Sequence, residues 1–166
     1  MQLTHYNTNF QQRTFPIILV TDNVVSPSNL GSLLRLSDAF GIEKLVLCGT
    51  DVMISRKTLR TSRATEKTVN FELQDDVNQV IEHYKRNNYQ IITLEITQNS
   101  HPLQSYTFKT DKPIVLVIGN ENFGVSEPVL AHSDQVVHIQ MFGKNSSMNV
   151  AQAANVALYE ITKQLI

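Results

Sequence analysis

The stretch Ile114–Gly124 reads IVLVIGNENFG and decides the fold, because it joins an apolar run to a polar segment that contains glycine. The run Ile114–Ile118 is apolar throughout, which is typical of a strand buried on both faces of a parallel sheet. Gly119–Gly124 then changes to glycine, asparagine and glutamate, which are residues of loops. Because ligands of open α/β sheets bind beyond the carboxyl ends of the strands, this junction predicts a central strand followed by a binding loop.

Predicted strands and helices alternate on both sides of this stretch. Short apolar segments predict strands at Pro16–Val20, Lys44–Cys48, Gln90–Ile96 and Val136–Ile139. Helical spacing of apolar residues predicts helices at Ser28–Gly41, Asp76–Asn87 and Met148–Leu165. Ser28 is the expected N-cap of the first helix and Gly41 its stop signal, and Thr97–Asp111 is expected to be irregular. The alternation predicts an α/β fold, a mostly parallel sheet flanked by helices.

Composition limits the class of protein. The 166 residues, 42% of them hydrophobic, suffice for one core, which we expect over residues 16–166 after a polar extension at residues 1–15. No apolar run approaches the roughly 18 residues of a membrane span, and the polar start of the chain does not resemble a signal peptide. The single cysteine, Cys48, excludes an internal disulfide and fits a reducing compartment. We therefore expect a cytoplasmic protein with no membrane partner.

The net charge of −1 provides no overall field that would attract nucleic acid. A local cluster of cations could still attract RNA. Four cations recur at the three- and four-residue steps of a helix, which would place much of their charge along one side: Arg56, Lys57, Arg60 and Arg63. One interpretation is a solvated helix face. The other is a patch that binds RNA phosphates while base identity is read elsewhere or through RNA shape.

Two further segments rich in glycine, asparagine and serine follow predicted strands, at Asp22–Gly31 and Phe142–Asn149. Their convergence with Gly119–Gly124 at one sheet edge locates a site. Gly119–Gly124 is neither a dinucleotide-binding G-x-G-x-x-G nor a P-loop. The five histidines lack metal-ligand spacing, and no G-x-S-x-G motif is present, so we expect neither a metal site nor a serine hydrolase.

Together, three segments resemble the three motifs of the SpoU branch of the SPOUT RNA methyltransferases, in the family's order. They are NLGSLLR at Asn29–Arg35, VIGNENFG at Val117–Gly124, and VVHIQMFG at Val136–Gly143 followed by SMNV at Ser147–Val150. The resemblance covers about Ile17–Ile161 and implies methyl transfer from S-adenosylmethionine to a ribose 2′-hydroxyl of RNA. It also implies a deep C-terminal trefoil knot, which no periodicity indicates, and a homodimer with its active site at the subunit interface. The small size of the chain favours tRNA over rRNA as the substrate.

The resemblance places catalytic roles on five residues: Arg35, Asn29, Glu121, Ser147 and Asn149. Arg35 stays protonated, so we expect it to stabilise a developing alkoxide, with a substrate phosphate helping to accept the proton. Among leucines an unpaired charge would be costly, and the alternative is a surface arginine whose stem covers apolar neighbours. Asn29, Ser147 and Asn149 would position the ribose and Arg35, although Asn29 and Ser147 are also good helix caps. Glu121 would lie beside the sulfonium or a guanidinium, or would simply be a solvated carboxylate.

Three residues match positions that contact S-adenosylmethionine in the family. Gly119 would contribute its backbone, and the alternative is a tight turn. Ile139 and Met148 would contact the cofactor with their side chains, and the alternative for both is core packing.

Four positions depart from the family pattern. Asn120 stands where a small residue is usual, Gln140 where proline is common, Met148 in place of leucine and Ala151 in place of serine. None removes the arginine, the glutamate or the motif asparagines, which favours an enzyme. The alternative is a non-catalytic RNA-binding module that retains the fold. A generic α/β nucleotide-binding protein would explain the loops but not Arg35 and Ser147 together. We also expect the chain to lack the separate N-terminal RNA-binding domain of some larger relatives.

Overall fold

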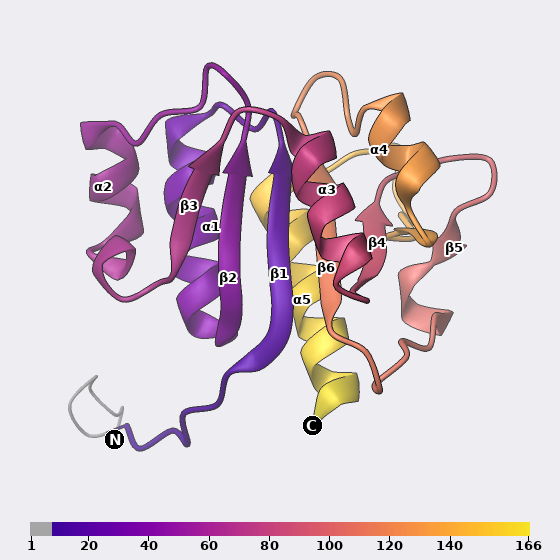
Figure 1. Ribbon diagram of the computed structural model, residues 1–166, viewed down its shortest axis with the longest axis horizontal. Coiled ribbons are helices and arrows are strands. Elements are labelled where there is room, and N and C mark those ends of the chain that lie inside the picture. Colours follow the sequence, from indigo (N-terminus) through magenta and orange to yellow (C-terminus); the bar gives the residue numbers. More distant parts are fainter. Residues whose placement is uncertain (1–7) are drawn as a thin grey trace.

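The computed structural model describes residues 8–166 and contains a seven-stranded sheet in the order β3-β2-β1-β6-β4-β7-β5 (Figure 1). The strands are β1 (Phe15–Asp22), β2 (Ile42–Cys48), β3 (Phe71–Gln74), β4 (Gln90–Leu94), β5 (His101–Pro102), β6 (Ile114–Gly119) and β7 (Gln135–His138). The helices are α1 (Pro27–Ala39), α2 (Arg56–Ser62), α3 (Val77–Arg86), α4 (Glu127–His132) and α5 (Val150–Leu165), with 3₁₀ turns η2 (Thr65–Lys67) and η3 (Leu103–Ser105). All neighbouring strands run parallel, so the predicted fold class is confirmed. Residues 1–7 of the predicted polar extension lie outside the described residues.

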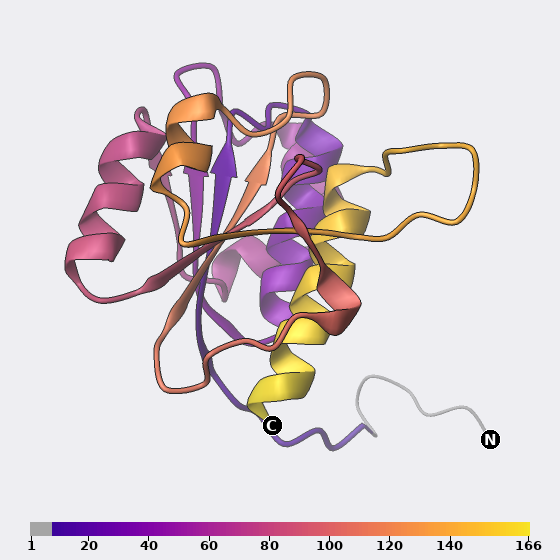
Figure 2. The same cartoon turned by 90° about the vertical axis from the view of Figure 1, so that its right-hand side faces the viewer.

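Helices cover both faces of the sheet. In Figures 1 and 2, α3 and α4 lie on one face, while α1 and α5 lie on the other with α2 packed against α1. Successive residues of β1 therefore enter different cores: Ile17 and Leu19 pack on the α1 and α5 side, and Ile18 and Val20 on the α3 and α4 side. All six residues of β6 are buried. This two-sided burial is the physical reason for the uninterrupted apolar runs.

Parallel pairing brings the carboxyl ends of all the strands to one edge of the sheet. β6 lies between β1 and β4, so the loops that follow these three strands are neighbours although they are far apart in the sequence. The longer loop between β7 and α5 projects from the body of the molecule on the α5 side (Figure 2). These loops include the segments that the sequence predicts to converge.

Helix α1 begins earlier than expected. Its N-cap is Ser26, and Ser28 lies inside the first turn, so the prediction of Ser28 as the cap is wrong. Pro27 explains the shift, because proline has no N–H to lose and its backbone angle suits the first helical position. The predicted stop signal is confirmed: Gly41 follows the C-cap with a φ of +57°.

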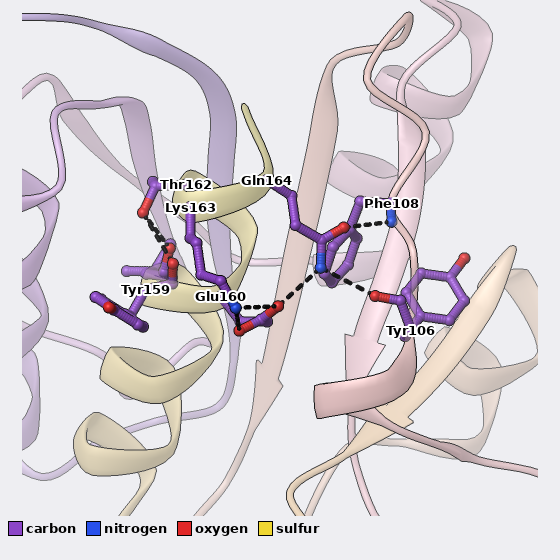
Figure 3. A network of polar contacts seen from close by, with 8 residues as sticks. Tyr106, Phe108, Tyr159, Glu160, Thr162, Lys163 and Gln164 are labelled. Atoms are coloured by element: carbon purple, nitrogen blue, oxygen red, sulfur yellow. Dashed lines mark hydrogen bonds and ion pairs between the residues drawn. The ribbon is translucent and has the colours of Figure 1, made fainter. Parts of the chain in front are cut away.

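Helix α5 begins at Val150, after Asn149. The Asn149 Oδ1 accepts hydrogen bonds from the backbone N–H groups of Ala151 and Gln152, so Ser147 does not cap this helix. Asn29 does not cap α1 either, because it lies inside the first turn of that helix, after the N-cap Ser26. Near the other end, Gln164 Oε1 accepts from the Phe108 N–H and Gln164 Nε2 donates to the Tyr106 carbonyl, both at 3.0 Å (Figure 3). These bonds hold the irregular segment after η3 against α5.

Short elements are where the sequence prediction fails. β3, β5 and α4 were not expected, and each is too brief to show a hydrophobic period. β3 is an edge strand with two of its four residues exposed, so its burial pattern is weak as well. Within the described residues, no helix is long and apolar enough to cross a membrane. The trefoil knot stays a prediction.

Candidate active site

A cavity of about 800 Å³ opens at the carboxyl edge of the sheet. Its walls are the ends of β4 and β6, the loops that follow β6 and β7, and the first turn of α5. The volume lies in the range of roughly 300–1,000 Å³ that is usual for small-molecule sites. The lining includes six of the residues singled out from the sequence: Gly119, Glu121, Ile139, Ser147, Met148 and Asn149.

A chain of side-chain hydrogen bonds connects the three sequence motifs beside this cavity. Asn149 Nδ2 donates to Asn29 Oδ1 at 2.9 Å, and Asn29 Nδ2 donates to Glu121 Oε1 at 2.7 Å. Because Asn149 Oδ1 already caps α5, its amide can present only its nitrogen to Asn29. Asn29 must then turn its own nitrogen toward Glu121. We call this unit the Asn149–Asn29–Glu121 chain.

The partner of Glu121 is therefore an amide. The expected pairing with a guanidinium is not found among residues 8–166, where Glu121 forms no ion pair. Asn29 is only 8% exposed, so its amide needs both partners to satisfy its polar atoms inside the protein. The Asn149–Asn29–Glu121 chain thus connects the start of α5, the first turn of α1 and the loop after β6.

Arg35 lies apart from this chain. It is exposed on α1, does not line the cavity, and forms no hydrogen bond or ion pair with another residue of the described range 8–166. The expectation of a costly charge among leucines is wrong, because Leu33 and Leu34 are buried while Arg35 faces solvent. Arg35 follows Asn29 by six residues, which places it about 9 Å further along the helix and on another face.

The loop after β6 folds back on itself, which explains Gly119 without a ligand. Asn120 and Gly124 exchange two backbone hydrogen bonds of 3.0 Å. A Cβ on Gly119 would lie 2.3 Å from the Gly124 carbonyl carbon. The tight-turn interpretation of Gly119 is therefore correct, and it is compatible with a backbone contact to a ligand, because Gly119 also lines the cavity.

Two carboxylates that the sequence analysis missed hold the same loop from opposite sides of β6. Asp22 ends β1, and its Oδ2 accepts from the Ser126 N–H at 2.8 Å. Glu95 follows β4, and its Oε2 accepts from the Val125 N–H at 3.0 Å. Asp22 comes two residues after the predicted strand Pro16–Val20, and Glu95 is the last residue but one of the predicted strand Gln90–Ile96. Their position at the carboxyl ends of strands is the signal that could have found them. Only Glu95 lines the cavity.

The four predicted RNA-binding cations lie on α2 and its C-cap. All four are exposed, and none forms an ion pair within residues 8–166; we call Arg56, Lys57, Arg60 and Arg63 the α2 cation patch. Helix α2 packs closely on α1 at Gly31, where a Cβ would lie 2.6 Å from the Thr58 carbonyl oxygen. The patch is therefore held against the helix that carries Asn29 and Arg35.

Comparison with known proteins agrees with this geometry. The model of the SpoU rRNA Methylase family matches residues 16–159. The chain belongs to this family.

Named relatives of this SpoU-family chain act on different RNAs. It is 28% identical over 154 residues to the tRNA (guanosine(18)-2′-O)-methyltransferase of Aquifex aeolicus, covering 93% of this chain and 72% of that protein. It is 30% identical over 169 residues to a 23S rRNA (guanosine-2′-O-)-methyltransferase of Haemophilus ducreyi, covering 98% of this chain and 67% of that protein.

Two solved structures show the same fold at a similar sequence identity. The TrmH/SpoU tRNA-modifying enzyme of Aquifex aeolicus superposes with a TM-score of 0.82 at 29% identity, covering 92% of this chain and 77% of that one. The SpoU methyltransferase AviRb of Streptomyces viridochromogenes, in complex with the cofactor AdoMet, gives a TM-score of 0.79 at 26% identity, covering 90% of this chain and 60% of that one. The chain thus spans about three fifths to three quarters of the length of these structures.

The structure accounts for two departures from the SpoU pattern. Asn120 Nδ2 donates to the Asn23 carbonyl at 2.6 Å, and Asn120 Oδ1 accepts from the N–H groups of Asn122 and Phe123. A larger polar residue in place of a small one thus organises the loop after β6. Ala151, where serine is common, is 5% exposed and packs in the core. Nothing in the structure explains Gln140.

Proposed function

We propose that this SpoU-family protein is an RNA methyltransferase that moves the methyl group of S-adenosylmethionine to a ribose 2′-hydroxyl of tRNA or rRNA. The observation that carries the proposal is the Asn149–Asn29–Glu121 chain, which joins the three family motifs beside the cavity. The two relatives described above support it, because both are RNA 2′-O-methyltransferases. These relatives act on tRNA in one case and on rRNA in the other, so both substrates are candidates.

The residues of the cavity fit S-adenosylmethionine. Ile139 and Met148 offer apolar surface for the adenosine part, Gly119 brings backbone close, and Glu121 carries negative charge. Bound there, S-adenosylmethionine would supply a methyl group that is already activated by its sulfonium sulfur. Catalysis by the protein then depends mainly on holding the ribose hydroxyl in line with that methyl group.

The chain's own side chains can orient that hydroxyl. Asn149 and Asn29 use their amides to hold Glu121, whose exposed side chain keeps its second oxygen, Oε2, for a ribose hydroxyl. Ser147 is exposed at the rim of the cavity and offers a further hydroxyl. A carboxylate fixed by a buried amide is preorganised, because it does not reorient when the substrate binds.

We further propose that Arg35 acts in the site of a partner subunit in a homodimer. Its position supports this, because Arg35 is exposed and lies outside the cavity of its own chain. A guanidinium entering from a second subunit would stabilise the developing alkoxide. In a symmetric dimer, mixing inactive R35A and E121A subunits should restore about a quarter of wild-type activity, because half the dimers are mixed and each has one complete site. No recovery after subunit exchange, or a monomer by light scattering at micromolar concentration, would contradict this arrangement.

Transfer of radiolabelled methyl from S-adenosylmethionine to RNA tests the main proposal. We expect label in the tRNA or the rRNA fraction of total RNA, in nucleotides that resist alkaline cleavage because their 2′-hydroxyl is blocked. The matched control is N149A, which should transfer no label. The alternative, a non-catalytic RNA-binding module, predicts RNA binding with no label in either fraction. A cytoplasmic location stays a prediction from the single cysteine, which is free and buried.

A further inference from the structure

We infer that Glu95 makes the cavity selective for the cationic form of its cofactor, favouring S-adenosylmethionine over the demethylated product S-adenosylhomocysteine. The inference rests on the proposed function, because it takes S-adenosylmethionine as the ligand of the cavity. Glu95 belongs to none of the three motifs that carry the family resemblance. It would act by charge on the bound cofactor and not on the ribose.

Glu95 is held rigidly at the cavity wall. Its Oε1 accepts from the Ile96 N–H at 2.8 Å and its Oε2 accepts from the Val125 N–H at 3.0 Å. The carboxylate also lies directly on the loop after β6, because a Cβ on Gly124 would lie 2.5 Å from Glu95 Oε2. A half-buried carboxylate fixed by two backbone amides keeps its position when a ligand enters.

The charge of the cavity is negative. Glu95 and Glu121 both line it, and among residues 8–166 no lysine or arginine does. Glu121 is bound to the Asn29 amide and belongs to the Asn149–Asn29–Glu121 chain. Glu95, whose donors are backbone N–H groups, is the carboxylate that is free of this chain.

The cofactor changes charge during the reaction. S-adenosylmethionine carries a sulfonium and an ammonium against one carboxylate, so its net charge is positive. When the methyl group leaves, the sulfur keeps the bonding electron pair and becomes a neutral thioether, so S-adenosylhomocysteine has no net charge. A carboxylate in a partly enclosed cavity interacts more strongly with a cation than it would in water, and it therefore favours the substrate form.

The competing explanation is that Glu95 only holds the loop. Asp22 shows what such a role looks like, because it accepts the next backbone N–H, that of Ser126, from the other side of β6. Asp22 is 2% exposed and does not line the cavity. D22N is thus the matched control for E95Q: both weaken the loop, but only E95Q removes charge from the cavity wall.

Calorimetric titration of S-adenosylmethionine and S-adenosylhomocysteine into the wild-type protein and its variants tests the inference. E95Q should weaken S-adenosylmethionine binding about tenfold and S-adenosylhomocysteine binding less than about twofold. D22N should change both affinities by the same factor. E95D, which keeps the charge, should retain most of the wild-type preference. Thermal melting without ligand checks that each variant is folded.

The wild-type protein provides a second readout that needs no variant. The ratio of its affinity for S-adenosylmethionine to its affinity for S-adenosylhomocysteine should fall as the salt concentration rises, because screening weakens the charge interaction. The role of Glu95 would be overturned if E95Q lost the same factor of affinity for both ligands. It would also be overturned if the ratio of the two affinities of the wild-type protein did not change with salt. If the wild-type protein bound neither ligand, the proposed function itself would fail, which is a distinct result.

Discussion

The contact between α1 and α2 at Gly31 can be tested by adding one methyl group. A Cβ at this position would lie 2.6 Å from the Thr58 carbonyl oxygen, 2.6 Å from Thr61 Cβ and 3.0 Å from the Ser62 nitrogen. Ordinary van der Waals contacts of a Cβ begin near 3.4 Å. Two of the three obstructing atoms belong to the backbone of α2, so α2 must move as a unit to admit the methyl group. Gly31→Ala is therefore expected to destabilise the protein.

The size of the effect follows from two opposing terms. Overpacking a well-packed contact typically costs about 1–3 kcal/mol, and the backbone obstruction puts this site near the upper end. Alanine is favoured over glycine inside a helix by about 1 kcal/mol, which offsets part of the cost. The expected net loss in the free energy of unfolding is about 2 kcal/mol. For a domain of this size, that loss corresponds to a fall in Tm of about 4–8 °C.

Urea unfolding followed by circular dichroism, at one fixed protein concentration, measures the loss. The matched control is Gly143→Ala, because a Cβ at Gly143 would have no heavy atom within 4 Å. The control should stay within about 0.5 kcal/mol of the wild-type protein. If Gly31→Ala were as stable as Gly143→Ala, the close packing of α2 on α1 would be wrong.

Three further predictions concern other parts of the molecule. Asn149→Ala should lower the free energy of unfolding by about 1–3 kcal/mol, through loss of the α5 cap and of the hydrogen bond to Asn29, and should abolish methyl transfer. Asn149→Asp keeps the cap but cannot donate to Asn29, so recovery of activity in that variant would refute the orientation of the Asn149–Asn29–Glu121 chain. Burial is the main cause, and the nearby Asp22 carboxylate the second, that raises the pKa of the Cys48 thiol to about 12. The thiol therefore stays protonated at neutral pH and should react with Ellman's reagent only after unfolding. Rapid reaction of the native protein would contradict this. Replacing Lys57, Arg60 and Arg63 of the α2 cation patch by alanine should weaken RNA binding and reduce the magnitude of the slope of log affinity against log salt by about 2–3, with cofactor affinity unchanged. An unaltered affinity and slope in filter binding would identify the patch as a solvated helix face.

The amino-acid sequence by itself determined the fold class and the edge of the sheet that carries the site. Uninterrupted apolar runs such as Ile114–Ile118 predict strands buried on both faces, because each side of a parallel sheet is covered by helices. Gly41 predicts the end of α1, because few other residues adopt its backbone angle. These signals are local in the chain, so they can be read without knowing which elements become neighbours.

Only the tertiary structure decided how the site residues are distributed. The placement of β6 between β1 and β4 brings Asp22 and Glu95 to one loop, and no spacing in the sequence reveals that strand order. The same holds for the contact of Asn149 with Asn29, which joins residues far apart in the chain, and for Arg35, whose helical face points to solvent. Periodicity identifies the buried side of a helix, but the packing of α1 against α2, α5 and the sheet decides which polar residue reaches the cavity and which remains outside it.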